Sequence, residues 1–207
     1  MKKIIFLITI FITFQNANAH KSGLFEHKAT KEDFAKAKDV IKTPEILRGN
    51  FTQIKNIKDL GKNFNSSGKF IFGGKNGIVW QMQKPFLSTI VFSENGLLIN
   101  NDSQNFDKSL FRELSNVFQA ILSGNIEKLQ DYFDVYFAHN NQGWRVGLIA
   151  KDNFLKDILT KIEISGKAYA NNIIIEDKYG DKTTIKFYDL RTNPPKLTKD
   201  EEKYFRQ

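Results

Sequence analysis

Short β-rich segments separated by turn signals recur along most of this chain, and they constrain the fold more than any other feature. The turns contain Gly, Asn, Asp and Ser, as in Glu94-Asn95-Gly96 and Asn140-Asn141-Gln142-Gly143. We expect strands near residues 48–57, 68–73, 77–83, 88–92, 97–100, 135–139, 144–150, 161–165, 173–177 and 183–189. Because βαβ alternation is missing, these segments predict an antiparallel, highly curved sheet or an open barrel.

Three helices are expected beside the strands. Thr30 with Asp33 forms an N-cap pattern, and apolar residues follow at helical spacing until Pro44. The clearest amphipathic helix lies between Asn105 and Gly124, and a short helix is expected at 126–132. The apolar positions of the helix between Asn105 and Gly124 are Phe106, Leu110, Phe111, Leu114, Val117, Phe118, Ile121 and Leu122.

Several expected strands are apolar on both faces. They include Phe70-Ile71-Phe72, Ile78-Val79-Trp80 and Ile173-Ile174-Ile175. A sheet with one solvated face alternates apolar and polar residues, so part of this sheet must be covered twice, or one face must line an apolar cavity. The central helix can supply cover, and the 19 Phe and 2 Trp residues favour a wide, aromatic-lined interior.

The N-terminus carries the pattern of an export signal. Lys2 and Lys3 precede an apolar run from Ile4 to Phe14, which is followed by Ala17-Asn18-Ala19. The alternative is a membrane anchor, but eleven helical residues rise only about 16 Å, against a hydrocarbon core of about 30 Å. We therefore predict a cleavable signal peptide at residues 1–19, a single domain at residues 20–207, and a soluble mature protein outside the cytoplasm.

The sequence suggests no catalytic or metal site. It has no cysteine, and its three histidines, His20, His27 and His139, are scattered. The acidic pairs Glu201-Glu202 and Glu176-Asp177 are interpreted as solvated surface. The formal charge of +8 is compatible with nucleic acid or an anionic membrane as partner, but it is interpreted as a solvated lysine-rich surface. We expect no enzymatic activity, cofactor, metal ion or nucleic acid.

Five motifs occur in an order that resembles a known family. They are G-x-F-x-Q-x-K at 49–55, S-G-x-F at 67–70, W-x-x-x-x-P at 80–85, the Gly143-Trp144 strand, and D-x-x-G-x-x-T-x-I-x-F at 177–187. Together they resemble the outer-membrane lipoprotein carrier family, LolA, over about residues 45–195.

The resemblance implies a mainly β, α+β fold, in which an incomplete antiparallel β-barrel (a half-barrel) is covered by an α-helical lid over a hydrophobic cavity. Members ferry acylated lipoproteins from an inner-membrane exporter to an outer-membrane acceptor, and we expect a monomer. Where carriers of this family place a lid-locking arginine, this chain has Gly73-Gly74-Lys75-Asn76. Lys75 lacks the bidentate fork of a guanidinium group.

The residues expected to line or cover the lipid-binding cavity are apolar and lie on the expected strands and the central helix. They are Phe70, Phe72, Trp80, Met82, Ile90, Phe92, Leu114, Phe118, Trp144 and Val146. For each, ordinary core packing is the alternative interpretation. Two other functions stay open: carriage of another lipid or glycolipid, and service as an envelope-stress sensor or scaffold that binds a protein partner.

Overall fold

A computed structural model describes residues 23–93, 96–100, 102–103, 108–151, 153–156 and 159–206, with the side chains of the central helix described from Ser115 onward. The predicted signal peptide and the side chain of Leu114 lie outside these described parts. None of the helices in the described ranges is both long enough and apolar enough to cross a bilayer.

The described chain contains mainly strands. The helical elements are η1 (Gly23–Phe25), α1 (Lys31–Val40), η2 (Gly74–Asn76), α2 (Lys108–Ser123), η3 (Ile126–Asp131), α3 (Asn153–Lys156) and α4 (Lys199–Phe205). The strands are β1 (Leu47–Ile57), β2 (Lys62–Phe72), β3 (Ile78–Lys84), β4 (Ser88–Ser93), β5 (Gly96–Ile99), β6 (Asp102–Ser103), β7 (Phe133–Asn140), β8 (Gly143–Ala150), β9 (Lys161–Gly166), β10 (Ala170–Glu176) and β11 (Lys182–Arg191).

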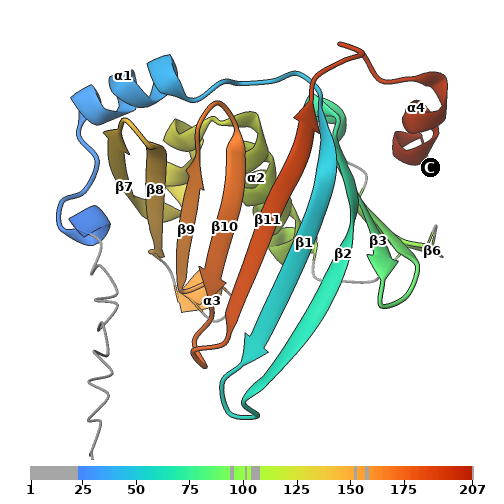
Figure 1. The fold of residues 1–207 in the computed structure, drawn as a ribbon, viewed down its shortest axis with the longest axis horizontal. Helices are drawn as coiled ribbons and strands as arrows, with labels where there is room; N and C mark the ends of the chain where they lie inside the picture. The colour runs from blue at the N-terminus through green and yellow to red at the C-terminus, as the bar shows by residue number, and fades with distance from the viewer. Residues whose placement is uncertain are drawn as a thin grey trace, which may run out of the picture.

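All the strands form one antiparallel sheet that is curved but not closed into a barrel (Figure 1). The strand order is β6-β5-β4-β3-β2-β1-β11-β10-β9-β8-β7. The first long strand therefore pairs with the last, and this β1–β11 ladder joins an N-terminal half, β1–β6, to a C-terminal half, β7–β11. The predicted open antiparallel sheet is confirmed.

Helix α2 covers the inner, concave face of the sheet, which is the far side of the sheet in Figure 1. Its Val117 and Ile121 are buried in the same core cluster as inner-face residues of both halves. Helix α1 packs against β7 and η3. The predicted N-cap of α1 is confirmed, because the Thr30 hydroxyl accepts from the Asp33 amide and the Asp33 carboxylate accepts from the Thr30 amide.

Helix α4 covers part of the outer, convex face. Val79 and Val91 project to this face from β3 and β4, yet both are buried. Gln81, on the same face, donates a hydrogen bond of 2.8 Å from Nε2 to the Tyr204 hydroxyl, and the Phe205 ring lies over Gly73. The predicted double cover is therefore present at β3 and β4, and α4 supplies its outer layer.

A buried arginine fastens the segment that ends in α4. The Arg48 side chain donates from Nε and Nη2 to the two carboxylate oxygens of Glu201, at 2.6 and 2.7 Å. It also donates to the carbonyls of Pro194 and Lys196, at 2.8 and 2.9 Å. The hydrogen bonds from Arg48 and a hydrogen bond from the Thr198 amide to the Glu201 carboxylate together lower the pKa of Glu201 to about 2.

The interpretation of Glu201 as solvated surface is therefore wrong. Its side chain is only 15% exposed, and it also completes a capping box with Thr198 at the start of α4. The pairing joins residues 153 positions apart, so nothing in the local polar sequence signals it. The neighbouring Glu202 pairs only with Arg206, one turn along the same helix.

Candidate functional site

Eight of the ten predicted cavity residues lie on strands, and the strand register places all eight on the inner face. Phe70 is opposite Trp80, and Trp80 is opposite Ile90. Since successive side chains of a strand point to opposite faces, residues that are opposite one another or two apart share a face. The eight are Phe70, Phe72, Trp80, Met82, Ile90, Phe92, Trp144 and Val146. The ninth, Phe118, reaches this face from α2, with its ring 6.2 Å from that of Phe92.

Exposure divides these nine residues into two groups. Four are buried, namely Phe70, Phe72, Trp144 and Val146. Five are partly exposed, namely Trp80, Met82, Ile90, Phe92 and Phe118. Leu97 and Ile99 extend the partly exposed group, because they pair with Phe92 and Ile90 on the same face of β5. We call the partly exposed inner-face residues of β3, β4 and β5 the β3–β5 face, and it is the candidate site.

Stacked aromatic rings form the floor of the β3–β5 face. The Trp80 indole stacks on the Phe51 ring with centroids 3.8 Å apart, and it meets the Phe187 ring edge-on at 6.0 Å. Phe70 packs against Phe187 at 4.9 Å. One side of Trp80 is thereby fixed by protein while the residue remains partly exposed. Phe51 and Phe187 are not among the predicted site residues, although they are the phenylalanines of the motifs at 49–55 and 177–187.

Two motif glycines make room for this floor. Gly68 is opposite Phe51 across β1 and β2, beside a bulge in the β2–β3 ladder. A β-carbon at Gly68 would lie 1.9 Å from the Gln81 carbonyl oxygen. Gly49 is opposite Phe70, and a β-carbon there would lie 2.9 Å from that ring. Gly49 therefore allows the close approach of the Phe70 ring, and Gly68 allows the close approach of the β3 backbone.

The inner face of the C-terminal half is mostly closed, and Phe137 and Ile175 are the partly exposed apolar residues described on it. Most of its residues are buried against each other, α1, α2, η3 and the α3 region. They include Phe133, Val135, Leu148, Ile162, Ile164 and Ile173. Trp144 and Val146 belong to this closed packing, so their contact with cargo stays a prediction.

Comparison with known proteins agrees with this architecture. The family model described as outer membrane lipoprotein carrier protein LolA matches residues 42–201. This chain belongs to the LolA family. The matched region runs from before β1 into α4, and it contains the whole sheet, the β3–β5 face and both partners of the Arg48–Glu201 ion pair.

Several solved structures are similar to this chain at low sequence identity. A LolA superfamily protein from Nitrosomonas europaea is 14% identical, with 86% of this chain and 97% of that chain covered and a TM-score of 0.46. A chain of the Pseudomonas aeruginosa MucA/MucB complex is 10% identical, with 82% of this chain and 57% of that chain covered and a TM-score of 0.41. A putative outer membrane lipoprotein-sorting protein domain from Vibrio parahaemolyticus is 9% identical, with 85% of this chain and 97% of that chain covered and a TM-score of 0.40. No curated protein matches the sequence.

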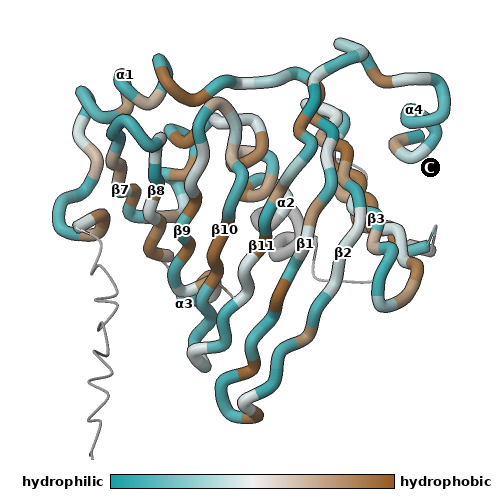
Figure 2. Tube along the Cα trace, viewed as in Figure 1, coloured by the Kyte–Doolittle hydropathy of each residue, from teal (hydrophilic) through white to brown (hydrophobic). Residues whose placement is uncertain are grey.

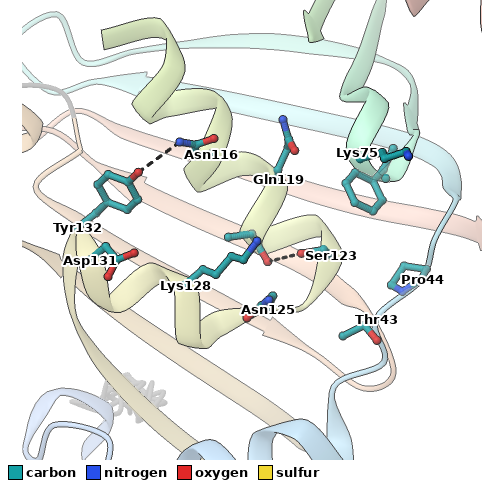
Figure 3. Close-up of a pocket in the computed structure, with 13 residues that line it drawn as sticks. Thr43, Pro44, Lys75, Asn116, Gln119, Ser123, Asn125, Lys128, Asp131 and Tyr132 are labelled. Carbon is teal, nitrogen blue, oxygen red and sulfur yellow. Dashed lines mark hydrogen bonds between the residues drawn. The ribbon is translucent and has the colours of Figure 1, made fainter. Parts of the chain in front are cut away.

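This LolA-family chain also has a polar cavity, separate from the β3–β5 face. It has a volume of about 730 Å³ and lies between the C-terminal half of α2, η3 and the segments around Pro44 and Lys75 (Figure 3). Asn116 and Tyr132 form a hydrogen bond of 3.3 Å in its wall. Lys75, near the position of the family's lid-locking arginine, lines this cavity together with Gln119 and Ser123 of α2. Amide, hydroxyl and ammonium groups suit an acyl chain poorly, so the β3–β5 face remains the candidate lipid site.

The described residues offer no sign of metal chemistry. No group of three histidine, aspartate or glutamate side chains within the described ranges lies close enough together to hold a metal ion. His139 projects from β7 opposite Trp144.

Proposed function

We propose that this LolA-family chain is a non-enzymatic periplasmic carrier, which binds the acyl chains of lipoproteins on the β3–β5 face and transfers them from the inner to the outer membrane. The observation that carries the proposal is the partly exposed row of Trp80, Met82, Ile90 and Phe92, above a buried aromatic floor. The family match supports the same function, since the family is described as an outer membrane lipoprotein carrier.

The size of the hydrophobic effect explains why such a face is needed. Each methylene group kept from water contributes about 0.8 kcal/mol, and the acyl chains of one lipoprotein carry tens of methylenes. Unassisted passage through water is therefore negligible. Phe118 of α2 faces Phe92 across the site, so a small displacement of α2 would widen the space between helix and sheet.

Release requires that the carrier bind acyl chains less tightly than its acceptor does. The β3–β5 face suits this requirement, because its partly exposed side chains offer apolar contact without polar anchors. Met82 adds an unbranched, adaptable side chain. We expect loose packing here to favour transfer over retention.

Native mass spectrometry of the protein purified from its own cell envelope tests the nature of the cargo. A complex with an acylated lipoprotein is the expected result. A complex with free lipid or glycolipid would show a different carrier. A complex with a protein partner and no acyl chain would show a sensor or scaffold instead.

Charge placed on the β3–β5 face tests the location of the site. Trp80→Glu and Phe118→Glu should each lower acyl-chain binding by more than about a hundredfold, because a carboxylate must then be buried against hydrocarbon. The measurement is displacement of a fluorescent fatty acid. Tyr188→Glu, on the exposed outer face of β11, is the matched control and should bind normally. If both inner-face variants bind like the unaltered protein, the site lies elsewhere.

A further inference from the structure

Large apolar side chains crowd the turns at one end of the sheet. Four such residues are more than 60% exposed: Leu60, Phe86, Leu87 and Tyr179. All four lie in the three turns that follow β1, β3 and β10. Among the described residues, no large apolar side chain elsewhere reaches this exposure. Four strongly exposed, large apolar side chains on neighbouring turns are a candidate interaction surface.

The sheet topology brings these three turns to the same end of the molecule. Strands β1, β3 and β10 run in one direction. Strand β2 lies between β1 and β3, strand β11 lies between β1 and β10, and every pair of neighbours is antiparallel. Figure 1 shows their ends at the lower side of the sheet, with the β1–β2 and β10–β11 turns next to each other. The Lys58 amide donates to Asp181 Oδ1 at 3.0 Å and joins those two turns. Hydrophobic colouring marks the β1–β2 turn and the loop after β3 in Figure 2.

Lysines flank the apolar turn residues. Lys58, Lys62, Lys84, Lys178 and Lys182 stand in or beside these turns, against Asp59, Glu176, Asp177 and Asp181, and Glu176 is directly opposite Lys182. Two of the four carboxylates accept hydrogen bonds from backbone amides within the turns, Asp177 from Tyr179 and Asp181 from Lys58. The turns thus combine apolar tips with a net positive charge, which is the chemistry of a segment that meets an anionic lipid surface.

We propose that these three turns, residues 58–62, 84–87 and 177–182, form a docking rim that binds the surface of an anionic lipid bilayer. The apolar tips enter the headgroup region, and the lysines pair with lipid phosphates. A bilayer fits better than a folded protein partner, because the apolar residues stand on separate projecting turns with lysines between them. This docking rests on the proposed function for its purpose, since Phe86 and Leu87 join β3 to β4 and thus border the β3–β5 face.

Vesicle flotation tests the docking rim. The probe is a vesicle of phosphatidylethanolamine with one-quarter phosphatidylglycerol, compared with a vesicle of pure phosphatidylcholine. The protein should float with the anionic vesicle at low salt and release at high salt. Phe86→Ser with Leu87→Ser should lower the partition coefficient at least about tenfold. Lys58→Gln, Lys62→Gln and Lys84→Gln together should lower it by about fivefold for each lysine at low salt.

Matched controls separate the rim from overall charge and fold. Lys31, Lys36 and Lys42 are exposed lysines in and just after α1, at the other end of the sheet, and their joint replacement by Gln should leave flotation nearly unchanged. Equal losses in the two triple variants would overturn the proposal, as would flotation unaffected by the Phe86 and Leu87 changes. Self-association through the rim in sedimentation, without vesicle binding, would also overturn it.

The same assay distinguishes docking from cargo carriage. Trp80→Glu should lose acyl-chain binding and still float with anionic vesicles. The Phe86 and Leu87 variant should bind a fluorescent fatty acid in solution and fail to float. If the unaltered protein floats but binds no acyl chain, docking stands and the carrier function is refuted. If the unaltered protein binds an acyl chain but does not float, the carrier function stands and docking is refuted.

Discussion

The two halves of the sheet share one strand pattern but differ in how far their inner faces are covered. In both, alternate residues place apolar side chains on the inner face. In the C-terminal half most of these side chains are buried under helical elements, with Phe137 and Ile175 partly exposed, and Leu155 and Leu159 of the α3 region join their core. In the N-terminal half, Trp80, Met82 and Ile90 remain partly exposed. The helical cover above a strand, rather than the strand's own sequence, therefore decides whether its apolar inner face is buried or partly exposed.

The largest effect expected from this contrast is the response to a buried charge. Val146→Asp should prevent folding, with a loss of about 4 kcal/mol or more, because Val146 is fully buried and a carboxylate there has no partner. Met82→Asp, on the partly exposed face, should cost only about 1 kcal/mol, because water reaches the new carboxylate. Urea unfolding of the two variants measures both losses. Similar losses would show that the β3–β5 face is core as well.

An intermediate effect is expected at the ion pair that holds α4 over β3 and β4. Glu201→Gln should lower the free energy of unfolding by about 3 kcal/mol at neutral pH, since it leaves Arg48 buried without its countercharge. Because the pKa of Glu201 is about 2 when folded and 4.5 ordinarily, its contribution is complete above pH 4.5 and is lost as the pH falls toward 2.

Unfolding curves of the unaltered protein and the Glu201→Gln variant between pH 7 and pH 2 measure this dependence. The two curves should converge on acidification. Glu202→Gln is the matched control and should cost little, because Glu202 pairs with Arg206 at the surface. A gap that stays constant down to pH 2 would contradict the assignment to Glu201 ionisation.

The smallest effect is expected on the outer face of the closed half. Arg145 and Glu163 form an ion pair across β8 and β9, with both side chains partly exposed. Glu163→Gln should lower the free energy of unfolding by only about 0.5 kcal/mol. A double-mutant cycle with Arg145→Met measures the coupling. Coupling of several kcal/mol would mean that surface charges, and not the closed inner face, stabilise this half.

The local elements were predictable because their signals are local. The strands at 48–57 and 144–150 and the capped helix after Thr30 lie within a few residues of β1, β8 and α1. Strand β2 begins at Lys62 rather than near 68, because its first residues are polar and are paired only through β1. Helix α4 was not predicted, and its position depends on Arg48, which is distant in sequence.

The site was predicted as a face but not as a division of that face. Strand alternation was enough to select inner-face residues such as Trp80 and Val146. It was not enough to separate them, since their exposure depends on which helices pack above each strand. Phe51 and Phe187 enter the site through the β1–β11 pairing, which sequence periodicity does not show.

The pairing of β1 with β11 also sets the order in which the molecule can assemble. A chain that is synthesised N-terminus first presents β1 early and β11 last, so the ladder between the two halves cannot form until nearly all residues have been made. Closing so long a loop is entropically costly and slow compared with the formation of hairpins such as β7–β8. Until that step, the β11-facing edge of β1 is unpaired and open to other extended chains. This edge of β1 is therefore protected only when the final strand arrives.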